Sequence, residues 1–204
     1  MPALFYEVVG MKRSVLSLLL ATILILAALS VNIGEASAAD PYKVEASAAK
    51  LAIDGSDEGY PKTGITAGKA VIKMAVWEST ISVHVRMQGA GWISVAFNKQ
   101  GKGMDGANMV LGYLDNSGKP AVRNDLGKGW THKQAEKQDV LESFVSQQSG
   151  ETAFEFSYPL KFASGYGIAG LEKGGVYTLV VAGNERSNNI SSKHTWYAKV
   201  DIGL

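Results

Sequence analysis

The chain has 204 residues, of which 46% are hydrophobic and 19% charged, and its formal net charge is +1. This balance gives no electrostatic reason to expect binding to nucleic acid or to an anionic membrane surface. Cysteine is absent, which excludes disulfides, thiolate metal sites and covalent heme attachment through a C-x-x-C-H motif. The fold therefore depends on core packing, helped by any ligand that binds only the folded state.

The N-terminal segment, residues 1–39, has the features of a secretory signal. Two basic residues precede an uncharged run, residues 15–31, and small residues offer a cleavage site after Ala38 or Ala39. The residues before Met11 lack signal character, so Met11 is a candidate for the true start. An uncleaved anchor is the alternative, because the run approaches the ~20 residues of a spanning helix. We expect cleavage and a secreted or periplasmic protein without membrane insertion.

The part that follows, residues 40–204, is the size of one domain. Residues 40 to about 50 are small and polar and look like a loose leader. We expect residues 40–67 to hold this leader and a first strand region, and residues 68–204 to form the main body of the domain.

Short segments with alternating apolar residues indicate β-strands. They are residues 70–76, 81–87, 91–98, 107–115, 152–160, 176–184 and 191–202. The segments 91–98 and 107–115 are apolar on both phases, as central strands can be. One helical candidate, residues 133–144, is mostly polar and is expected to be a surface connection. The pattern predicts an all-β fold, an antiparallel β-sandwich of the immunoglobulin-like type.

The run GKGMDG, residues 101–106, matches the G-x-G-x-x-G fingerprint of dinucleotide-binding proteins. The fingerprint works because its third glycine opens a helix whose N-terminus faces a pyrophosphate. Here the glycines lead into a predicted strand, so we interpret the run as a flexible loop. Its large apolar residue, Met104, makes sense if the loop folds it inward against something.

Three histidines are candidates for a site. His84 lies on the polar phase of its strand and His132 in a polar segment, so both are expected at the surface. His194 shares the apolar phase of the final strand with Trp196 and Val200. A histidine on such a face needs a partner for its ring nitrogens. It is either a satisfied core residue or a ligand.

The chemistry of these residues narrows the kind of site. No two histidines are closely spaced, which disfavours a zinc or copper site made of imidazoles, and no Ser-His-Asp arrangement supports acid–base catalysis. Iron in a porphyrin needs only two axial ligands, and an imidazole with a thioether suits electron transfer. Met104 and His194 are able to supply that pair, although their sequence positions alone do not require it.

Several motifs recur in a fixed order along the chain. They are GWISVAFN at 91–98, MDGA at 104–107, MVLGYLD at 109–115, FEFSYPL at 154–160 and YTLVVAGN at 177–184. In this order they resemble the DOMON domain family over nearly all of residues 68–202. The resemblance implies a β-sandwich. Members of the family divide into heme b cytochromes and heme-free modules proposed to bind sugars or to mediate contacts.

The resemblance also implies site residues. In the heme-binding branch, which includes the cytochrome domain of cellobiose dehydrogenase, one Met and one His are axial ligands, and these fall on Met104 and His194. A related branch pairs Met with Lys, which makes Lys193 a weaker candidate, and Met109 is the fallback for Met104. The family's F-S-R-P-L motif has Tyr158 in place of arginine here. If that arginine holds heme propionates or the sheet edge, another group must do so.

We therefore predict a secreted b-type cytochrome that binds one non-covalent heme b and transfers single electrons, without being an enzyme itself. Its partner would be a redox protein that the sequence does not identify. Met104 and His194 would ligate the iron. The candidates for the pocket wall are Trp92, Phe97, Met109 and Trp196, and those that would face the propionates are Lys102, Lys193 and Arg186.

Two alternatives remain open at this stage. The first is a heme-free module in which Trp92, Trp130 or Tyr113 stacks on a sugar. The second is a small domain used for surface contacts or for assisting another exported protein. The colour of the purified protein distinguishes the cytochrome from both.

Overall fold

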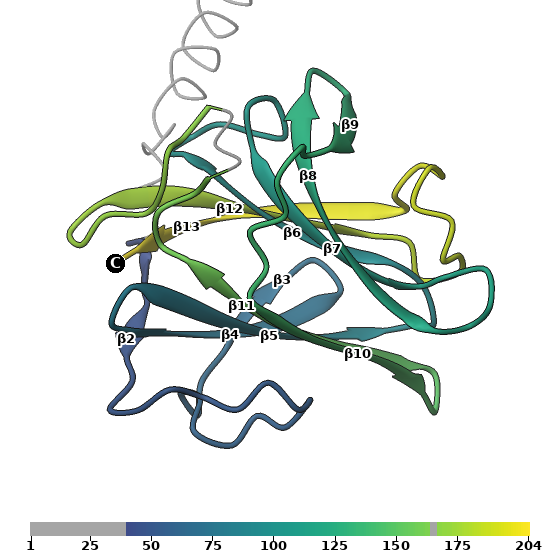
Figure 1. Cartoon of the computed structure of the whole chain (residues 1–204), viewed down its shortest axis with the longest axis horizontal. Coiled ribbons are helices and arrows are strands. Elements are labelled where there is room, and N and C mark those ends of the chain that lie inside the picture. The colour runs from purple at the N-terminus through teal and green to yellow at the C-terminus, as the bar shows by residue number, and fades with distance from the viewer. Residues whose placement is uncertain (1–39, 164–166) are drawn as a thin grey trace, which may run out of the picture. The chain divides into compact units, whose positions relative to one another are not determined.

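The computed structural model describes residues 40–163 and 167–204, and this part contains thirteen β-strands in two sheets (Figure 1). The predicted signal segment, with the possible start at Met11, lies outside the described residues. Within the described ranges, no helix has the length and apolar character needed to cross a membrane.

Sheet A has seven strands in the order β1–β13–β12–β6–β7–β8–β9. Its neighbours pair antiparallel except for β1, which is parallel to β13. The strands are β1 (Tyr42–Lys43), β6 (Ile93–Lys99), β7 (Asn108–Leu114), β8 (Pro120–Lys128), β9 (Thr131–Gln134), β12 (Val176–Gly183) and β13 (Trp196–Gly203).

Sheet B has the order β10–β11–β5–β4–β2, and β3 also pairs with β4. Its one parallel pair is β2 with β4. The strands are β2 (Glu45–Ala46), β3 (Ile65–Ala67), β4 (Ala70–Trp77), β5 (Thr80–Gln88), β10 (Glu142–Gln148) and β11 (Glu151–Pro159). Apart from two short parallel pairs, the predicted antiparallel β-sandwich is confirmed.

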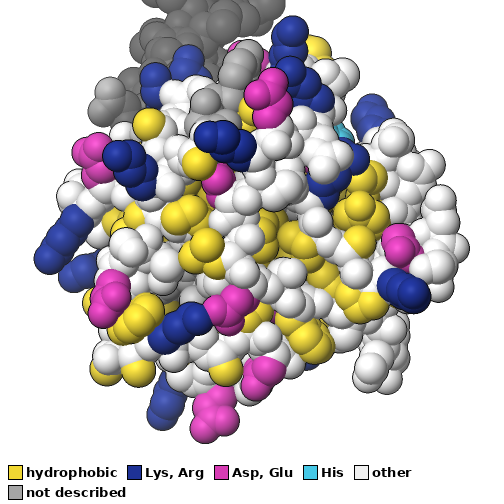
Figure 2. Space-filling model, viewed as in Figure 1, with side chains coloured by type: hydrophobic (Ala, Val, Ile, Leu, Met, Phe, Trp, Pro, Cys, Tyr) yellow, Lys and Arg dark blue, Asp and Glu magenta, His cyan; other side chains and the backbone are white. Residues whose placement is uncertain are grey.

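The main core lies between the two sheets, which Figure 1 shows as stacked layers. It contains the inward residues of both, with fully buried aromatic side chains at Phe97, Phe154 and Phe156. Burying a side chain of this size contributes ~1.5–3 kcal/mol. On the face of the molecule seen from the same side, exposed parts of hydrophobic side chains gather near the centre, with many charged side chains around them (Figure 2).

The central strands of sheet A are apolar on both phases because their residues join an apolar cluster on each face of the sheet. Inward residues such as Val95 and Leu179 join the main core. The outward phase forms a second cluster of Ala96, Ala107, Met109, Leu111 and Val180, against which Met104 and Ile190 pack. The outer face of an antiparallel sheet is commonly polar. An apolar cluster on this face therefore indicates a candidate binding surface.

Two local expectations were wrong. The helical candidate 133–144 contains the end of β9 and the start of β10, with an irregular connection between them. It has no apolar stripe to hold a helix, and the Gln138 side chain instead bonds the backbone of Asn124, accepting from its N–H at 2.7 Å. The expected loose leader instead places β1 on sheet A and β2 on sheet B.

Candidate functional site

A cavity with two lobes lies on the outer face of sheet A, and we call it the outer cavity. The larger lobe has a volume of about 640 Å³ and the smaller about 260 Å³. Pockets of a few hundred Å³ and above hold small ligands and cofactors. Residues that line both lobes are Met104, Met109, Trp130, Ala182 and His194.

Small outward residues on neighbouring strands make the floor of the cavity. Ser94 and Ala96 come from β6 and Ala182 from β12, and Ser94 and Ala182 are cross-strand partners. The hydroxyl of Ser94 is buried and has no hydrogen-bond partner among the described residues. Leaving such a group without a partner costs roughly 1–3 kcal/mol.

The loop that carries Met104 is held in place by Asn98, the last residue of the GWISVAFN motif. The Asn98 side-chain amide donates to the carbonyl oxygens of Gly103 at 2.7 Å and Asp105 at 2.8 Å. The loop leads into β7, as expected, and it turns Met104 toward the second apolar cluster and the outer cavity. Asn98 therefore helps to set the position of the Met104 thioether.

His194 reaches the same cavity by a route that differs from the expected one. It lies in the loop before β13, which begins only at Trp196, so the strand alternation does not extend back to it. Trp196 points into the main core. His194 instead lines the outer cavity, together with Tyr197 and Lys199, which are on the outward phase of β13. Its ring meets Tyr197 edge-on at 5.7 Å between centroids. No hydrogen bond to its ring nitrogens occurs among the described residues.

The other predicted wall residues divide between the two faces of sheet A. Trp92 and Met109 line the outer cavity. Phe97 and Trp196 belong to the main core, where Phe97 stacks on Tyr158 at 6.4 Å between centroids. Among the basic residues suggested for propionates, Lys193 lines the larger lobe; Lys102 and Arg186 line neither.

A buried ionic group beside the larger lobe was missed in the sequence. Asp125, whose side chain is fully buried, accepts from Arg123 Nε at 2.6 Å and interacts with His132 Nδ1 at 2.5 Å. Both Arg123 and His132 line the lobe, so His132 is not the solvated residue that we expected. Burial by itself would raise the pKa of Asp125, but hydrogen bonds from His132 and Arg123 lower it below the ordinary value.

The lining of the outer cavity carries positive charge. Arg123, Lys193 and Lys199 contribute to its walls, and no Asp or Glu does so within the described residues. Among all the residues that the structure describes, no group of three His, Asp or Glu side chains is placed to hold a metal ion. The thioether of Met104 and the imidazoles of His132 and His194 also line this largely apolar space. Its basic lining suits a mainly apolar ligand that carries anionic groups.

His84 was also expected to be solvated, but it is buried on the outer face of sheet B. The segment before β3 covers His84. The Nε2 atom of His84 lies 3.3 Å from the carbonyl oxygen of Gly55, and the ring centroids of His84 and Tyr60 are 5.6 Å apart. This burial lowers the pKa of His84.

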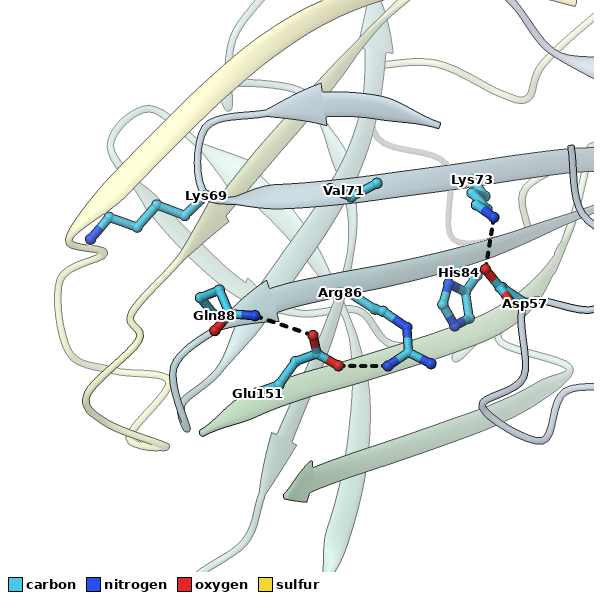
Figure 3. A pocket seen from close by; sticks show the side chains of 8 residues that line it. All are labelled: Asp57, Lys69, Val71, Lys73, His84, Arg86, Gln88 and Glu151. Carbon is cyan, nitrogen blue, oxygen red and sulfur yellow. Dashed lines mark hydrogen bonds and ion pairs between the residues drawn. The ribbon is translucent and has the colours of Figure 1, made fainter. Parts of the chain in front are cut away.

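A second depression, of about 260 Å³, lies beside His84 (Figure 3). Four of its charged residues form two ion pairs with one another, and Lys69 pairs with Glu185 outside the depression. Lys73 bonds Asp57 at 2.7 Å, and Arg86 bonds Glu151 at 2.5 Å. We therefore place the candidate site in the outer cavity, where the charges are of one sign.

Tyr158, at the position where the resemblance implies an arginine, lies inside the sandwich and away from the outer cavity. Its hydroxyl is 2.8 Å from Asn108 Oδ1 and 2.6 Å from Asn124 Oδ1. This position therefore links β11 to β7 and β8 through a buried polar cluster. The contacts are those of a structural residue.

Comparisons with known proteins identify one family model and several similar structures. The profile of the DOMON domain matches residues 67–184. No curated relative matches the chain. The solved structures to which the chain is similar include the cytochrome b domain of pyranose dehydrogenase from Coprinopsis cinerea (12% identity, TM-score 0.48, covering 65% of this chain and 75% of that one).

The chain is similar to two further solved structures of different kinds. One is the cytochrome domain of Myriococcum thermophilum cellobiose dehydrogenase, with 12% identity, a TM-score of 0.47 and coverage of 66% of this chain and 74% of that one. The other is a family 9 carbohydrate-binding module from Caldicellulosiruptor kristjanssonii in complex with cellotriose, with 10% identity, a TM-score of 0.46 and coverage of 78% and 83%.

Proposed function

The chain belongs to the DOMON domain family, and within that family we propose that it is a secreted b-type cytochrome. In this proposal it binds one heme b in the outer cavity and carries single electrons, without catalysing a reaction itself. Its partner is another redox protein outside the cytoplasm. The signal features of residues 1–39 support the location.

One observation carries the proposal: Met104 and His194 line both lobes of the same apolar cavity. They come from loops far apart in the chain, one between β6 and β7 and the other before β13. A thioether and an imidazole would together hold a heme iron in a form suited to electron transfer. The surroundings of His194 support this role further, because no hydrogen bond from the described residues engages its ring nitrogens.

The remaining features of the cavity fit a porphyrin. Its floor is made of small residues, its walls include Trp92 and Met109, and its charged lining is basic. When bound, heme b supplies a reversible one-electron couple, and a Met ligand raises its potential relative to a second His. The role of the chain is to hold the two donor atoms, keep water from the apolar floor and balance the propionate charges.

The test is reconstitution of the purified domain with hemin, followed by reduced-minus-oxidised absorbance spectra. We expect a low-spin spectrum with sharp bands on reduction. His194→Ala should lose most of the bound heme, because imidazole is the stronger ligand. Met104→Ala should keep part of the heme in a high-spin form.

A matched control is His84→Gln, which changes a histidine on the other sheet, away from the outer cavity. Its spectrum should be that of the wild type. Normal heme content in the His194→Ala protein, or a colourless wild-type protein after reconstitution, would contradict the proposal.

One observation favours a second candidate, a sugar-binding module. Trp130 is 97% exposed at the rim of the outer cavity, where its ring face is available for stacking. Of the other aromatic residues suggested for this role, Trp92 is buried and Tyr113 does not line the cavity. Binding of cello-oligosaccharides by a colourless protein, lost in Trp130→Ala, would support this candidate over the cytochrome.

A further inference from the structure

A basic group at the edge of the outer cavity is organised from beneath by a buried carboxylate. Arg123 and Asp125 are on the same phase of β8, and His132 reaches them from β9, where it pairs with Gly127. Asp125 receives two bonds from Arg123, one from Nε and one from a terminal nitrogen, and a third from His132. These contacts fix the direction of the guanidinium before any ligand arrives.

The guanidinium retains binding capacity after pairing with Asp125. Arginine has five N–H donors, and the contacts to Asp125 use two of its nitrogens. The side chain remains 25% exposed and lines the larger lobe. Lys193 lines the same lobe without an acidic neighbour in the lining, so the local charge stays positive even with Asp125 included.

We propose that Arg123 is the residue that recognises a ligand carboxylate in the outer cavity, and that Asp125 and His132 hold its guanidinium in position. Under the proposed function, on which this inference rests, the carboxylate is a heme propionate. The planar guanidinium matches a carboxylate through two parallel hydrogen bonds, which a lysine does not reproduce. This role replaces the one expected for Arg186 and Lys102, neither of which lines the cavity.

The test compares two iron porphyrins that differ only in their carboxylates: hemin and its dimethyl ester. Each is titrated into the purified domain and followed by absorbance. The wild type should bind hemin at least about tenfold more tightly than the ester. Arg123→Gln should remove most of that preference by lowering the affinity for hemin. The affinity for the ester should change by less than about twofold. Arg123→Lys should retain part of the preference.

Arg186→Gln is the matched control, because Arg186 is a highly exposed arginine outside the cavity lining. It should leave the preference intact. Urea unfolding of each ligand-free variant identifies loss of fold, and Arg123→Lys keeps a cation beside Asp125 if the glutamine variant is unstable. A wild type without preference, or equal weakening of both porphyrins by Arg123→Gln, overturns the proposal.

His132→Gln separates a positioning residue from an iron ligand. It should reduce the preference a few-fold and leave the low-spin spectrum unchanged. Loss of that spectrum would place His132 on the iron and overturn its assignment here. If hemin gives the expected low-spin spectrum without any preference over its ester, the role of Arg123 fails and the proposed function stands. If neither porphyrin binds, both fail.

Discussion

Gly127 and Met104 approach so closely that a Cβ on Gly127 would lie 1.9 Å from the carbonyl oxygen of Met104 and 3.2 Å from its Cγ. Backbone hydrogen bonds fix the loop at this point: Gly127 N–H donates to Ala107 at 2.9 Å, and Gly106 N–H donates to Gly127 at 3.1 Å. The obstructing atom is backbone, so a side chain at position 127 must displace the whole loop. The position of the Met104 thioether, in the loop before β7, therefore depends on a glycine in β8.

Gly127→Ala should move Met104 away from the iron while the sandwich still folds. We expect ferric heme in this variant to become largely high-spin, as in Met104→Ala, and the free energy of unfolding to fall by ~1–3 kcal/mol from overpacking. Absorbance spectra and urea unfolding measure the two effects.

Gly103→Ala is the control for that substitution, because it lies in the same loop and its added Cβ meets no protein atom within 4 Å. Gly103 lines the smaller lobe, so this control adds only a single methyl group there. It should keep the low-spin spectrum. A low-spin Gly127→Ala protein would mean that the close contact does not set the position of Met104.

Ala182→Leu should block the cavity without harming the fold. Ala182 is an outward residue of β12 that lines both lobes, so the added carbons enter the cavity and not the main core. We expect hemin affinity to fall about 100-fold, with the free energy of unfolding of the ligand-free protein within ~0.5 kcal/mol of the wild type. Ala121→Leu, on β8 away from the cavity, should leave affinity unchanged; the same affinity in both variants would exclude the cavity as the binding site.

Trp130→Ala should speed ligand loss without changing ligation. Trp130 lines both lobes and has no other cover, so a bound ligand is the natural contact for its ring. We expect heme transfer to excess apomyoglobin to be about tenfold faster, which corresponds to ~1.4 kcal/mol, with an unchanged spectrum. Leu141→Ala, which removes an exposed apolar residue elsewhere, should not alter the rate; equal rates for the two variants would remove Trp130 from the site.

His84 should make the fold sensitive to mild acid. Burial lowers its pKa from 6.5, so below pH 6.5 the unfolded chain takes up a proton that the folded chain resists. Stability from this residue is present above pH 6.5 and is lost as the pH falls, by at most ~1.4 kcal/mol per pH unit. His84→Gln, whose amide can still donate to Gly55, should flatten this dependence. Urea unfolding between pH 5.5 and about 8.5 tests it, and parallel curves for both proteins below pH 6.5 would contradict it.

Seven of the strands, β4 to β7 and β11 to β13, could be predicted from the sequence because they show local alternation, whereas β8, β9 and β10 were not predicted. Met104 and His194 stay predicted iron ligands, chosen from equally local patterns. Alternation over residues 81–87 is a property of one strand, and the unusual thioether within the glycine loop is visible without a fold. The apolar character of both phases in β6 and β7 was also visible. Its cause was not, because only the assembled sheet shows that the second phase covers a cavity.

The positions of the histidines required tertiary structure. His194 was assigned to the face of Trp196 because nothing local marks where β13 begins. His132 reaches Asp125 only through the β8–β9 hairpin, for which the glycine at position 129 was the available signal. His84 lies on a polar phase, but the segment around Gly55 covers it, and sequence alternation contains no information about such a cover.

The division of sheet A into two faces has a consequence for how this domain can change. In β6, Val95 holds the two layers together, while its neighbours Ser94 and Ala96 meet whatever occupies the cavity. Adjacent positions in one strand thus answer to separate demands, stability for one and ligand choice for the next. A scaffold with this property can change its ligand specificity by substitutions at every second residue of a strand, while its core residues stay the same.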